Sequence, residues 1–270
     1  MIFASDLDRT LIYSEKFLQG YVGQVRAVES GQYNSYMTQR ATGLLRQIAR
    51  CLLFIPCTTR TIEQYQRIQF FQTEVIPRYA LASNGANLLV EGAVDRVFQK
   101  SIFHTLANEC LAGPEIIKEF GRLASAEWTQ PLRQADGVFY YCVIDRTKAP
   151  RQELARFRDW ARKQNWELSI QGRKLYLVPA VINKGTALKR MAEITGDDRI
   201  ISVGDSLLDL PLLLEAEYAI SPAHGELYEE LYEQFANSGR WKFTEVSGIG
   251  AGEEILELAL DYAGFRTSWI

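Results

Sequence analysis

Short apolar runs alternate along the sequence with stretches whose apolar residues recur every three or four positions. Runs of four to five residues have the length of buried strands, and the longer periodic stretches have the spacing of amphipathic helices. The clearest helix is expected after Thr38, which can cap it, with apolar residues from Ala41 to Leu52 on one face. Strands are expected at 2–5, 52–55, 79–82, 199–203, 218–220 and 242–246. Strands that alternate with helices predict a parallel sheet with crossover helices.

The alternation changes character between residues 87 and 183. This stretch contains an expected strand at 137–144, a hairpin at 166–178 and helices at 100–125 and 150–164. Hairpins mixed with helices are typical of an α+β module. We therefore predict a discontinuous α/β core, residues 1–86 and 184–270, interrupted by an inserted α+β domain at 87–183.

Residues 13–37 show no clear period and are rich in polar and tyrosine residues. A hairpin around Ser30-Gly31 is compatible with their pattern, and we interpret the segment as an extended flap. A plain surface loop remains the alternative.

The composition narrows the class of protein. Hydrophobic residues make up 47% of the chain, charged residues 23%, and the net charge is −3, which is typical of a soluble globular protein and gives no electrostatic footprint for nucleic acid or an anionic membrane. The four cysteines, Cys51, Cys57, Cys110 and Cys142, lack the spacing of a zinc site or a disulfide framework. A strand expected at Ile2 leaves no room for a leader, and no apolar run has the length of a membrane span. We expect a cytoplasmic protein with reduced cysteines.

The first expected strand ends at two carboxylates, Asp6 and Asp8, separated only by Leu7. In an open α/β sheet, ligands bind beyond the carboxyl ends of the strands. Two nearby carboxylates repel each other unless a cation or a shared proton intervenes, which favours a divalent metal with oxygen ligands. Taken alone, the same residues also fit a turn followed by a helix cap.

Three other expected boundaries carry polar residues. The strand at 52–55 leads to Thr58, Thr59 and Arg60; a helix begins at Lys184; and the strand at 199–203 leads to Asp205 and Asp209. A cation is disfavoured at a helix N-terminus, so Lys184 calls for an anion nearby. Each feature alone also has an ordinary structural explanation, and their combination is what indicates a site.

This ordered set resembles the motifs of the haloacid dehalogenase (HAD) superfamily of aspartate-nucleophile phosphatases. The resemblance covers essentially the whole chain and is greatest to members with a large α/β cap between the second and third motifs, such as Cof-type and sucrose-phosphate phosphatases. It implies a Rossmann-like core, 1–86 and 184–270, with the cap at 87–183.

The resemblance also implies a role for each matching residue. Asp6 would be the nucleophile that forms an aspartyl-phosphate, and Asp8 the general acid and base. Thr58 and Lys184 would bind the phosphate group. Asp205 and Asp209, with Asp6 and the backbone carbonyl of Asp8, would hold one Mg²⁺.

Substrate-binding candidates surround these positions. The turn at Asn84-Gly85 resembles a cap junction where the asparagine touches substrate, although a plain tight turn is equally compatible. Arg60 would orient substrate or brace its loop, and Arg173 or Lys174 at the expected hairpin turn would select the leaving group. Arg9 and Thr59 stand where the family often has glycine, so Arg9 is a candidate for a second anionic group of the substrate.

These residues predict a Mg²⁺-dependent phosphatase that hydrolyses a small phosphorylated metabolite such as a sugar phosphate. The alternatives are a phosphomutase that uses the same aspartyl-phosphate, and a catalytically silent metabolite-binding protein. No nucleic-acid or membrane partner is expected. We interpret the basic helix near residues 148–163 as a solvated face, and His104 and His224 as structural.

Overall fold

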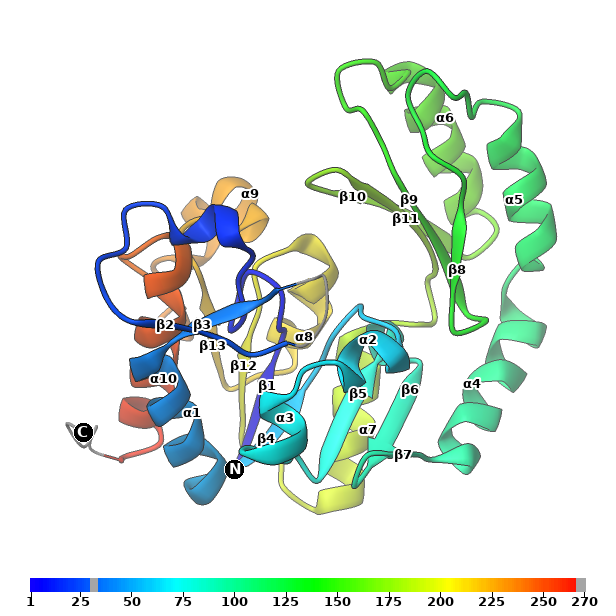
Figure 1. Ribbon diagram of the computed structural model, residues 1–270. Helices are drawn as coiled ribbons and strands as arrows, with labels where there is room; N and C mark the ends of the chain where they lie inside the picture. Colours follow the sequence, from blue (N-terminus) through cyan, green and yellow to red (C-terminus); the bar gives the residue numbers. More distant parts are fainter. Residues whose placement is uncertain (30–33, 266–270) are drawn as a thin grey trace. The chain divides into compact units, whose positions relative to one another are not determined.

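The structure, a computed structural model, describes residues 1–29 and 34–265. It divides into two compact units, shown in Figure 1. The first unit combines Met1–Val94 with Lys184–Ile270, and the second is Asp95–Asn183. The first unit is thus built from two stretches that are separated in sequence by the second.

A five-stranded sheet in the order β14-β13-β12-β1-β4 forms the centre of the first unit, and all its neighbouring strands are parallel. Two of its inner strands, β1 and β12, are buried at every residue, as expected for a parallel sheet that is covered on both faces. The strands are β1 (Ile2–Ser5), β4 (Leu53–Pro56), β12 (Ile200–Val203), β13 (Tyr218–Ser221) and β14 (Trp241–Phe243).

Helices cover the sheet. Apolar residues of α1 and α10 form one buried cluster with Phe3 and Phe54, whereas residues of α8 and α9 pack with β13 and β14 in another. Thr38 caps α1 as predicted, because its hydroxyl accepts a hydrogen bond from the Ala41 N–H at 2.9 Å. The helices are α1 (Gln39–Cys51), α7 (Lys184–Thr195), α8 (Leu210–Leu214), α9 (Glu226–Phe235) and α10 (Ala251–Tyr262).

A small antiparallel sheet, β5-β6-β7, continues the first unit beyond β4. Strand β5 meets the chain after β4 at one parallel bridge, Cys57 with Leu81, so it runs parallel to the central strands as expected. Residues 87–94, which we placed at the start of the insert, contain β6, which pairs with β5, and β7, which pairs with β6, and they belong to the first unit. The strands are β5 (Tyr79–Ala82), β6 (Asn87–Val90) and β7 (Ala93–Val94).

The second unit is an antiparallel sheet, β10-β11-β9-β8, with three helices. Its core joins aromatic residues of the helices, such as Phe120 and Phe157, to Leu175 and Leu177 of the sheet. The expected hairpin turns at Gly172, whose φ is +54°. The elements are α4 (Arg96–Glu109), α5 (Gly113–Gly121), β8 (Arg133–Ala135), β9 (Phe139–Val143), α6 (Arg151–Arg162), β10 (Trp166–Gln171) and β11 (Lys174–Pro179).

The expected flap contains a short helix, η1 (Glu15–Leu18), and two antiparallel strands, β2 (Val25–Ala27) and β3 (Tyr36–Thr38). The turn expected at Ser30-Gly31 lies outside the described residues. Two short helices, α2 (Ile62–Gln66) and α3 (Phe70–Thr73), lie between β4 and β5. Within residues 1–29 and 34–265, no helix is long and apolar enough to cross a membrane.

The predicted fold class is confirmed: a parallel sheet flanked by helices is interrupted in sequence by an α+β unit.

One packing contact fixes how α7 enters the first unit. A Cβ atom on Gly185 would overlap the carbonyl oxygen of Pro211, so α7 and α8 approach each other through a glycine. This close approach places the preceding residue, Lys184, beside the loop that follows β12.

We expect Gly185→Ala to destabilise the protein by about 1–3 kcal/mol, because the added methyl group must push α7 away from α8. Gly43→Ala is the matched control, since a Cβ there meets nothing within 4 Å in helix α1. This control should stabilise the protein by up to about 1 kcal/mol through its higher helix propensity. Urea unfolding of both variants measures the difference, and equal destabilisation by the two would contradict the packing argument.

Candidate active site

The carboxyl ends of β1 and β12 bring carboxylates from distant parts of the sequence together. Asp6 follows β1, and its N–H donates to the Val203 carbonyl at 2.9 Å, so the two strands stay paired up to the first carboxylate. Asp205 and Asp209 follow β12 on the adjacent loop and on the short helix η3 (Leu207–Asp209). One carboxylate oxygen of each of these three residues lies within 4.8 Å of the others.

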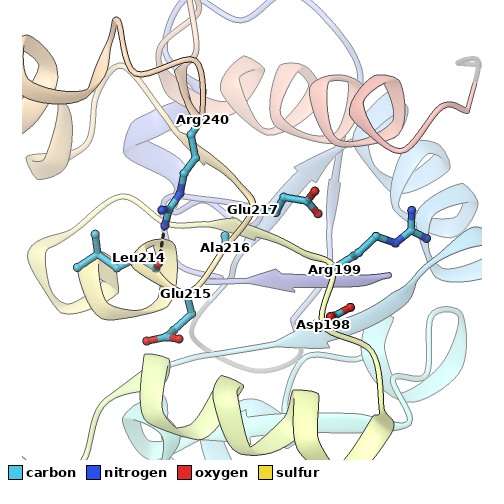
Figure 2. Close-up of a pocket in the computed structure, with 7 residues that line it drawn as sticks. All are labelled: Asp198, Arg199, Leu214, Glu215, Ala216, Glu217 and Arg240. Atoms are coloured by element: carbon cyan, nitrogen blue, oxygen red, sulfur yellow. Dashed lines mark hydrogen bonds between the residues drawn. The ribbon is translucent and has the colours of Figure 1, made fainter.

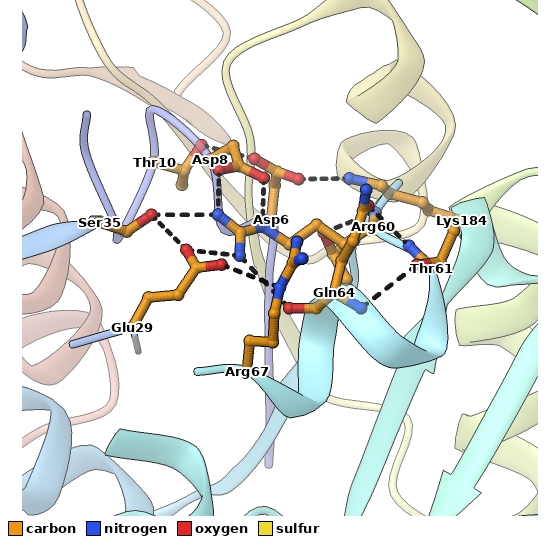
Figure 3. Close-up of polar contacts among 11 residues, drawn as sticks. Asp6, Asp8, Thr10, Glu29, Ser35, Arg60, Thr61, Gln64, Arg67 and Lys184 are labelled. Atoms are coloured by element: carbon orange, nitrogen blue, oxygen red, sulfur yellow. Dashed lines mark hydrogen bonds and ion pairs between the residues drawn. The ribbon is translucent and has the colours of Figure 1, made fainter. Parts of the chain in front are cut away.

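Lys184 is the buried cation of this cluster, with only 1% of its side chain exposed. Its Nζ donates to Asp6 Oδ1 and to Asp209 Oδ1, each at 2.5 Å. We call these three residues the buried ion triad. Thr10 adds a hydroxyl hydrogen bond to Asp6 Oδ2 at 3.2 Å, so both oxygens of Asp6 have a donor (Figure 3).

Asp209 is held on its other side by the loop that precedes it. Its Oδ2 accepts hydrogen bonds from the Asp205 N–H, the Ser206 N–H and the Ser206 hydroxyl, at 3.2, 3.0 and 2.7 Å. A Cβ on Gly204 would overlap the Cβ of Asp209, so a glycine is required where the loop closes on this side chain. The loop therefore fixes Asp209 before any ligand is present.

Burial and crowding set the electrostatics of the cluster. Burial, and then the nearby Asp209 charge, raise the pKa of Asp6 to about 7 although Lys184 acts in the opposite direction. The same two causes raise the pKa of Asp205 well above its ordinary value. Burial alone would favour a neutral Lys184, but Asp209 and Asp6 raise the pKa of its amine. The cluster has more negative than positive groups and therefore favours a further cation.

The three carboxylates fit a divalent metal with hard oxygen ligands. Asp205 Oδ2 is buried and makes no hydrogen bond within the described part of the chain, although Arg9 Nε lies 3.2 Å from it. A buried carboxylate oxygen without a hydrogen-bond donor is costly unless an ion completes its surroundings. Asp6, Asp205 and Asp209 therefore have both the chemistry and the spacing to hold Mg²⁺.

Asp8 differs from Asp6 in its surroundings, since 49% of its side chain is exposed. Arg60 donates to both of its oxygens, from Nε at 2.7 Å and from Nη2 at 2.8 Å. This ion pair joins Asp8, which follows β1, to Arg60, which follows β4. Asp6 and Asp8 thus have different cationic partners, Lys184 for Asp6 and Arg60 for Asp8.

The loop after β4 is buried at Thr58 and half-buried at Thr59. The Thr58 hydroxyl accepts the Arg60 N–H at 3.1 Å, and the Thr58 carbonyl accepts the Asn84 N–H at 2.9 Å. Asn84 and Gly85 lie in a tight turn with φ values of 60° and 92°. Asn84 is buried, so this turn packs directly against the loop that carries Thr58.

Arg9 adopts a left-handed conformation with φ 68°, where glycine would be less strained. Its Nη2 donates to the His224 carbonyl at 2.9 Å, and its guanidinium lies 5.5 Å from the centre of the Phe17 ring. His224 holds the Arg9 backbone in return, because its Nε2 lies 2.9 Å from the Arg9 carbonyl while its Nδ1 accepts the Gly248 N–H at 3.0 Å. These contacts assign the proton of a neutral imidazole to Nε2.

Arg173 and Lys174 lie in the second unit, at the exposed turn between β10 and β11. The Arg173 carbonyl accepts the Ile144 N–H at 2.8 Å, and the Lys174 amine lies 5.9 Å from the centre of the Tyr141 ring. Their role as substrate contacts stays a prediction.

Several polar residues of the site were not among the sequence candidates. Thr10 lies two residues after Asp8, and Ser206 directly follows Asp205, so the sequence position of each indicated that it could belong to the site. Glu29 and Ser35, which contact each other and Arg60, lie in the stretch without a clear period and had no such signal, and Arg67, which contacts Glu29, had none either.

A surface pocket of about 390 Å³ lies elsewhere in the first unit (Figure 2). Most of its lining residues precede β12, β13 or β14, at the amino ends of the strands, whereas Asp6 and Asp205 follow the carboxyl ends. Its lining mixes acidic and basic side chains, and Arg240 donates a hydrogen bond to the Leu214 carbonyl across it. The lining residues are Asp198, Arg199, Leu214, Glu215, Ala216, Glu217 and Arg240.

The parallel sheet, the inserted α+β unit and the carboxylates beyond the strand ends define a HAD-like fold. No family model matches the sequence, and no curated protein matches it. Among solved structures, the sucrose-phosphatase of Synechocystis sp. PCC6803, determined with sucrose and phosphate, is similar with a TM-score of 0.71, 16% identity and coverage of 99% of each chain.

Two further solved structures have the same fold. The HAD subclass IIB sugar phosphatase BT4131 is similar with a TM-score of 0.66 and 11% identity, over 97% of this chain and 98% of that one. A trehalose-6-phosphate phosphatase related protein has a TM-score of 0.56 and 14% identity, over 98% and 99% of the two chains. The chain therefore shares its HAD-like fold with these solved structures over 97–99% of its length.

We expect Lys184→Met to lower the free energy of unfolding by about 3–5 kcal/mol, because it leaves two buried carboxylates without their cation. Lys189→Met, an exposed lysine of the same helix that pairs with Glu215, is the matched control and should change it by less than about 0.5 kcal/mol. Urea unfolding at neutral pH without added metal makes the comparison. Similar small effects of both substitutions would show that the buried ion triad is not a major constraint.

The His224 contacts predict a pH dependence of stability. Burial lowers the pKa of His224, so the folded state disfavours its protonation and this contribution is lost as the pH falls from the ordinary value of 6.5 through the lower folded value. The free energy of unfolding should therefore decrease more steeply between pH 7 and 5 in the wild type than in His224→Gln. His104→Gln, at an exposed position of α4, serves as the control, and identical slopes for wild type and His224→Gln would reject the prediction.

Proposed function

We propose that the protein is a Mg²⁺-dependent phosphatase that hydrolyses a small phosphorylated metabolite through an aspartyl-phosphate. The observation that carries this proposal is the position of Asp6, a buried carboxylate held between Lys184 and Thr10 beside Asp205 and Asp209. A nucleophile for phosphoryl transfer needs fixed geometry and neutralised charge more than it needs intrinsic reactivity. The buried ion triad supplies both.

The proposed reaction uses two carboxylates in two steps. An oxygen of ionised Asp6 attacks the phosphorus while the bond to the leaving oxygen breaks, and Asp8, which enters this step protonated, donates its proton to that oxygen. A water molecule then attacks the aspartyl-phosphate, Asp8 accepts its proton, and inorganic phosphate leaves with Asp6 regenerated. Lys184 and the Thr58 region contribute donors for the phosphoryl oxygens.

Asp6, Asp205 and Asp209 would hold the Mg²⁺ ion. When bound, it would supply positive charge that favours the ionised carboxylates and neutralises the phosphoryl group. Burial and the nearby Asp209 charge raise the pKa values of Asp6 and Asp205, so a bound cation would favour the ionised forms of both carboxylates.

We propose a sugar phosphate as the substrate class, since solved structures of the same fold include a sucrose-phosphatase and a sugar phosphatase. In this proposal the second unit acts as the specificity domain. Arg173 and Lys174 fit such a role because they place two exposed cations at one hairpin turn. A library of phosphorylated metabolites, assayed for phosphate release with Mg²⁺ present, would identify the leaving group.

Asp6→Asn should lower the turnover of p-nitrophenyl phosphate with Mg²⁺ by at least about 1000-fold, because an amide cannot serve as the nucleophile. The matched control is Asp198→Asn, an exposed aspartate at the opposite end of β12, which should retain wild-type turnover. A cooperative thermal unfolding transition above the assay temperature shows that Asp6→Asn is folded, so that the loss is chemical. Wild-type-like turnover by Asp6→Asn would refute the proposed function, and release of inorganic phosphate without a bisphosphate activator separates hydrolysis from mutase chemistry.

A further inference from the structure

Arg60 is the centre of a polar network that extends from Asp8 to the flap (Figure 3). A guanidinium has five N–H groups, and Arg60 makes five side-chain hydrogen bonds, all to protein acceptors. Besides the two to Asp8, it donates to Glu29, Ser35 and the carbonyl of Gln64. A substrate oxygen could bind Arg60 only by displacing one of these acceptors.

Glu29 is the buried end of this network. Only 1% of its side chain is exposed, yet it lies in the segment between β2 and β3 that has no apolar period. Its oxygens lie 2.9 Å from Arg60 Nη1 and 3.5 Å from Arg67 Nε, and one of them accepts the Ser35 hydroxyl at 2.7 Å. Burying a carboxylate costs several kcal/mol unless such partners surround it, so these contacts hold the Glu29 side chain beside Arg60.

The two carboxylate partners of Arg60 differ in exposure, so one of them can anchor the guanidinium while the other faces solvent. Glu29 is enclosed and has three partners, whereas half of the Asp8 side chain is exposed. An exposed aspartate ordinarily samples several rotamers. Here, the planar guanidinium of Arg60 donates to both oxygens of Asp8, while its Nη1 is bound to Glu29. The Asp8 carboxylate is therefore fixed.

We propose that Glu29 is a positioning residue that holds Arg60, and that Arg60 in turn orients Asp8 for proton transfer to the leaving oxygen. The inference rests on the proposed phosphatase function. It assigns Arg60 to the general acid rather than to substrate, and it gives the flap a role in the reaction through a residue about twenty positions away from Asp8 in sequence.

The proposal predicts a dependence on the leaving group. p-Nitrophenolate leaves readily as an anion, whereas phenolate is a poorer leaving group and needs more help from a positioned acid. Misplacing Asp8 should therefore slow hydrolysis of phenyl phosphate more than hydrolysis of p-nitrophenyl phosphate. The two esters are otherwise similar in shape, so a difference in binding contributes little.

The test compares kcat/KM for the two esters in wild type, Glu29→Gln and Glu74→Gln, with Mg²⁺ present. Glu29→Gln keeps the shape of the side chain and an acceptor oxygen but removes the charge that anchors Arg60. We expect it to lower kcat/KM for phenyl phosphate by about tenfold and for p-nitrophenyl phosphate by less than about twofold. Glu74, which pairs with Arg26 and Arg46 at the surface, is the matched control and should leave both values unchanged.

A double-mutant cycle shows whether Glu29 acts through Asp8. In an Asp8→Asn background, Glu29→Gln should cause no further loss on phenyl phosphate, because the acid it positions is already absent. An equal loss on both esters in the single variant, or a full tenfold additional loss in the double variant, would overturn the proposal and leave Glu29 with a stabilising role alone. Thermal unfolding of each variant confirms that it is folded at the assay temperature.

The proposed function and this inference fail in different ways. If the wild type releases no phosphate from either ester, the phosphatase function is refuted and the inference with it. If the wild type hydrolyses both esters and Glu29→Gln shows no leaving-group dependence, only the role of Glu29 is refuted.

Discussion

The buried ion triad is the interaction on which the rest of the site depends. Lys184 lies at the first turn of α7, where the helix dipole disfavours a cation, and it is almost fully buried. Asp6 and Asp209 compensate both costs, and they come from the ends of two neighbouring parallel strands. Because an unpaired buried charge is costly, a displacement of β1, β12 or α7 at this point would destabilise the first unit. The same contact therefore restrains these elements and positions the proposed nucleophile.

The parallel sheet explains why these groups meet although they are far apart in sequence. All five strands of the central sheet run in the same direction, so the residues that follow β1, β4 and β12 emerge at one edge. Backbone hydrogen bonds hold that edge in register: the Asp6 N–H donates to the Val203 carbonyl and the Cys57 N–H to the Ser5 carbonyl. The glycine at 204 then allows the Asp209 side chain to approach the loop closely. The regular backbone at the strand ends therefore fixes the positions of the charged side chains that follow the strands.

The sequence predicted what depends on local pattern and on parallel order. Apolar runs located the central strands, and polar residues directly after them located Asp6, Asp8, Thr58, Asp205 and Asp209. We placed the start of the insert at residue 87, where the helix–strand alternation changes, and only the pairing of β6 with β5 assigns these residues to the first unit. Glu29 could not be found in the same way. Its importance comes from burial against Arg60 and Arg67, and a segment without a hydrophobic period gives no indication of which side chains are enclosed.

Arg9 is part of the charge balance of the carboxylate cluster. Its Nε lies 3.2 Å from Asp205 Oδ2, its Nη2 is bound to the His224 carbonyl, and its strained backbone is held by the His224 ring. The cluster therefore contains three carboxylates and two cations, Lys184 and Arg9, so its formal charge is −1 when all five groups are ionised. With Lys184 alone it would be −2, and mutual repulsion among the carboxylates would be larger. A glycine at position 9 would relieve the backbone strain but would remove this cation, which explains why a side chain is present at a conformation that favours glycine.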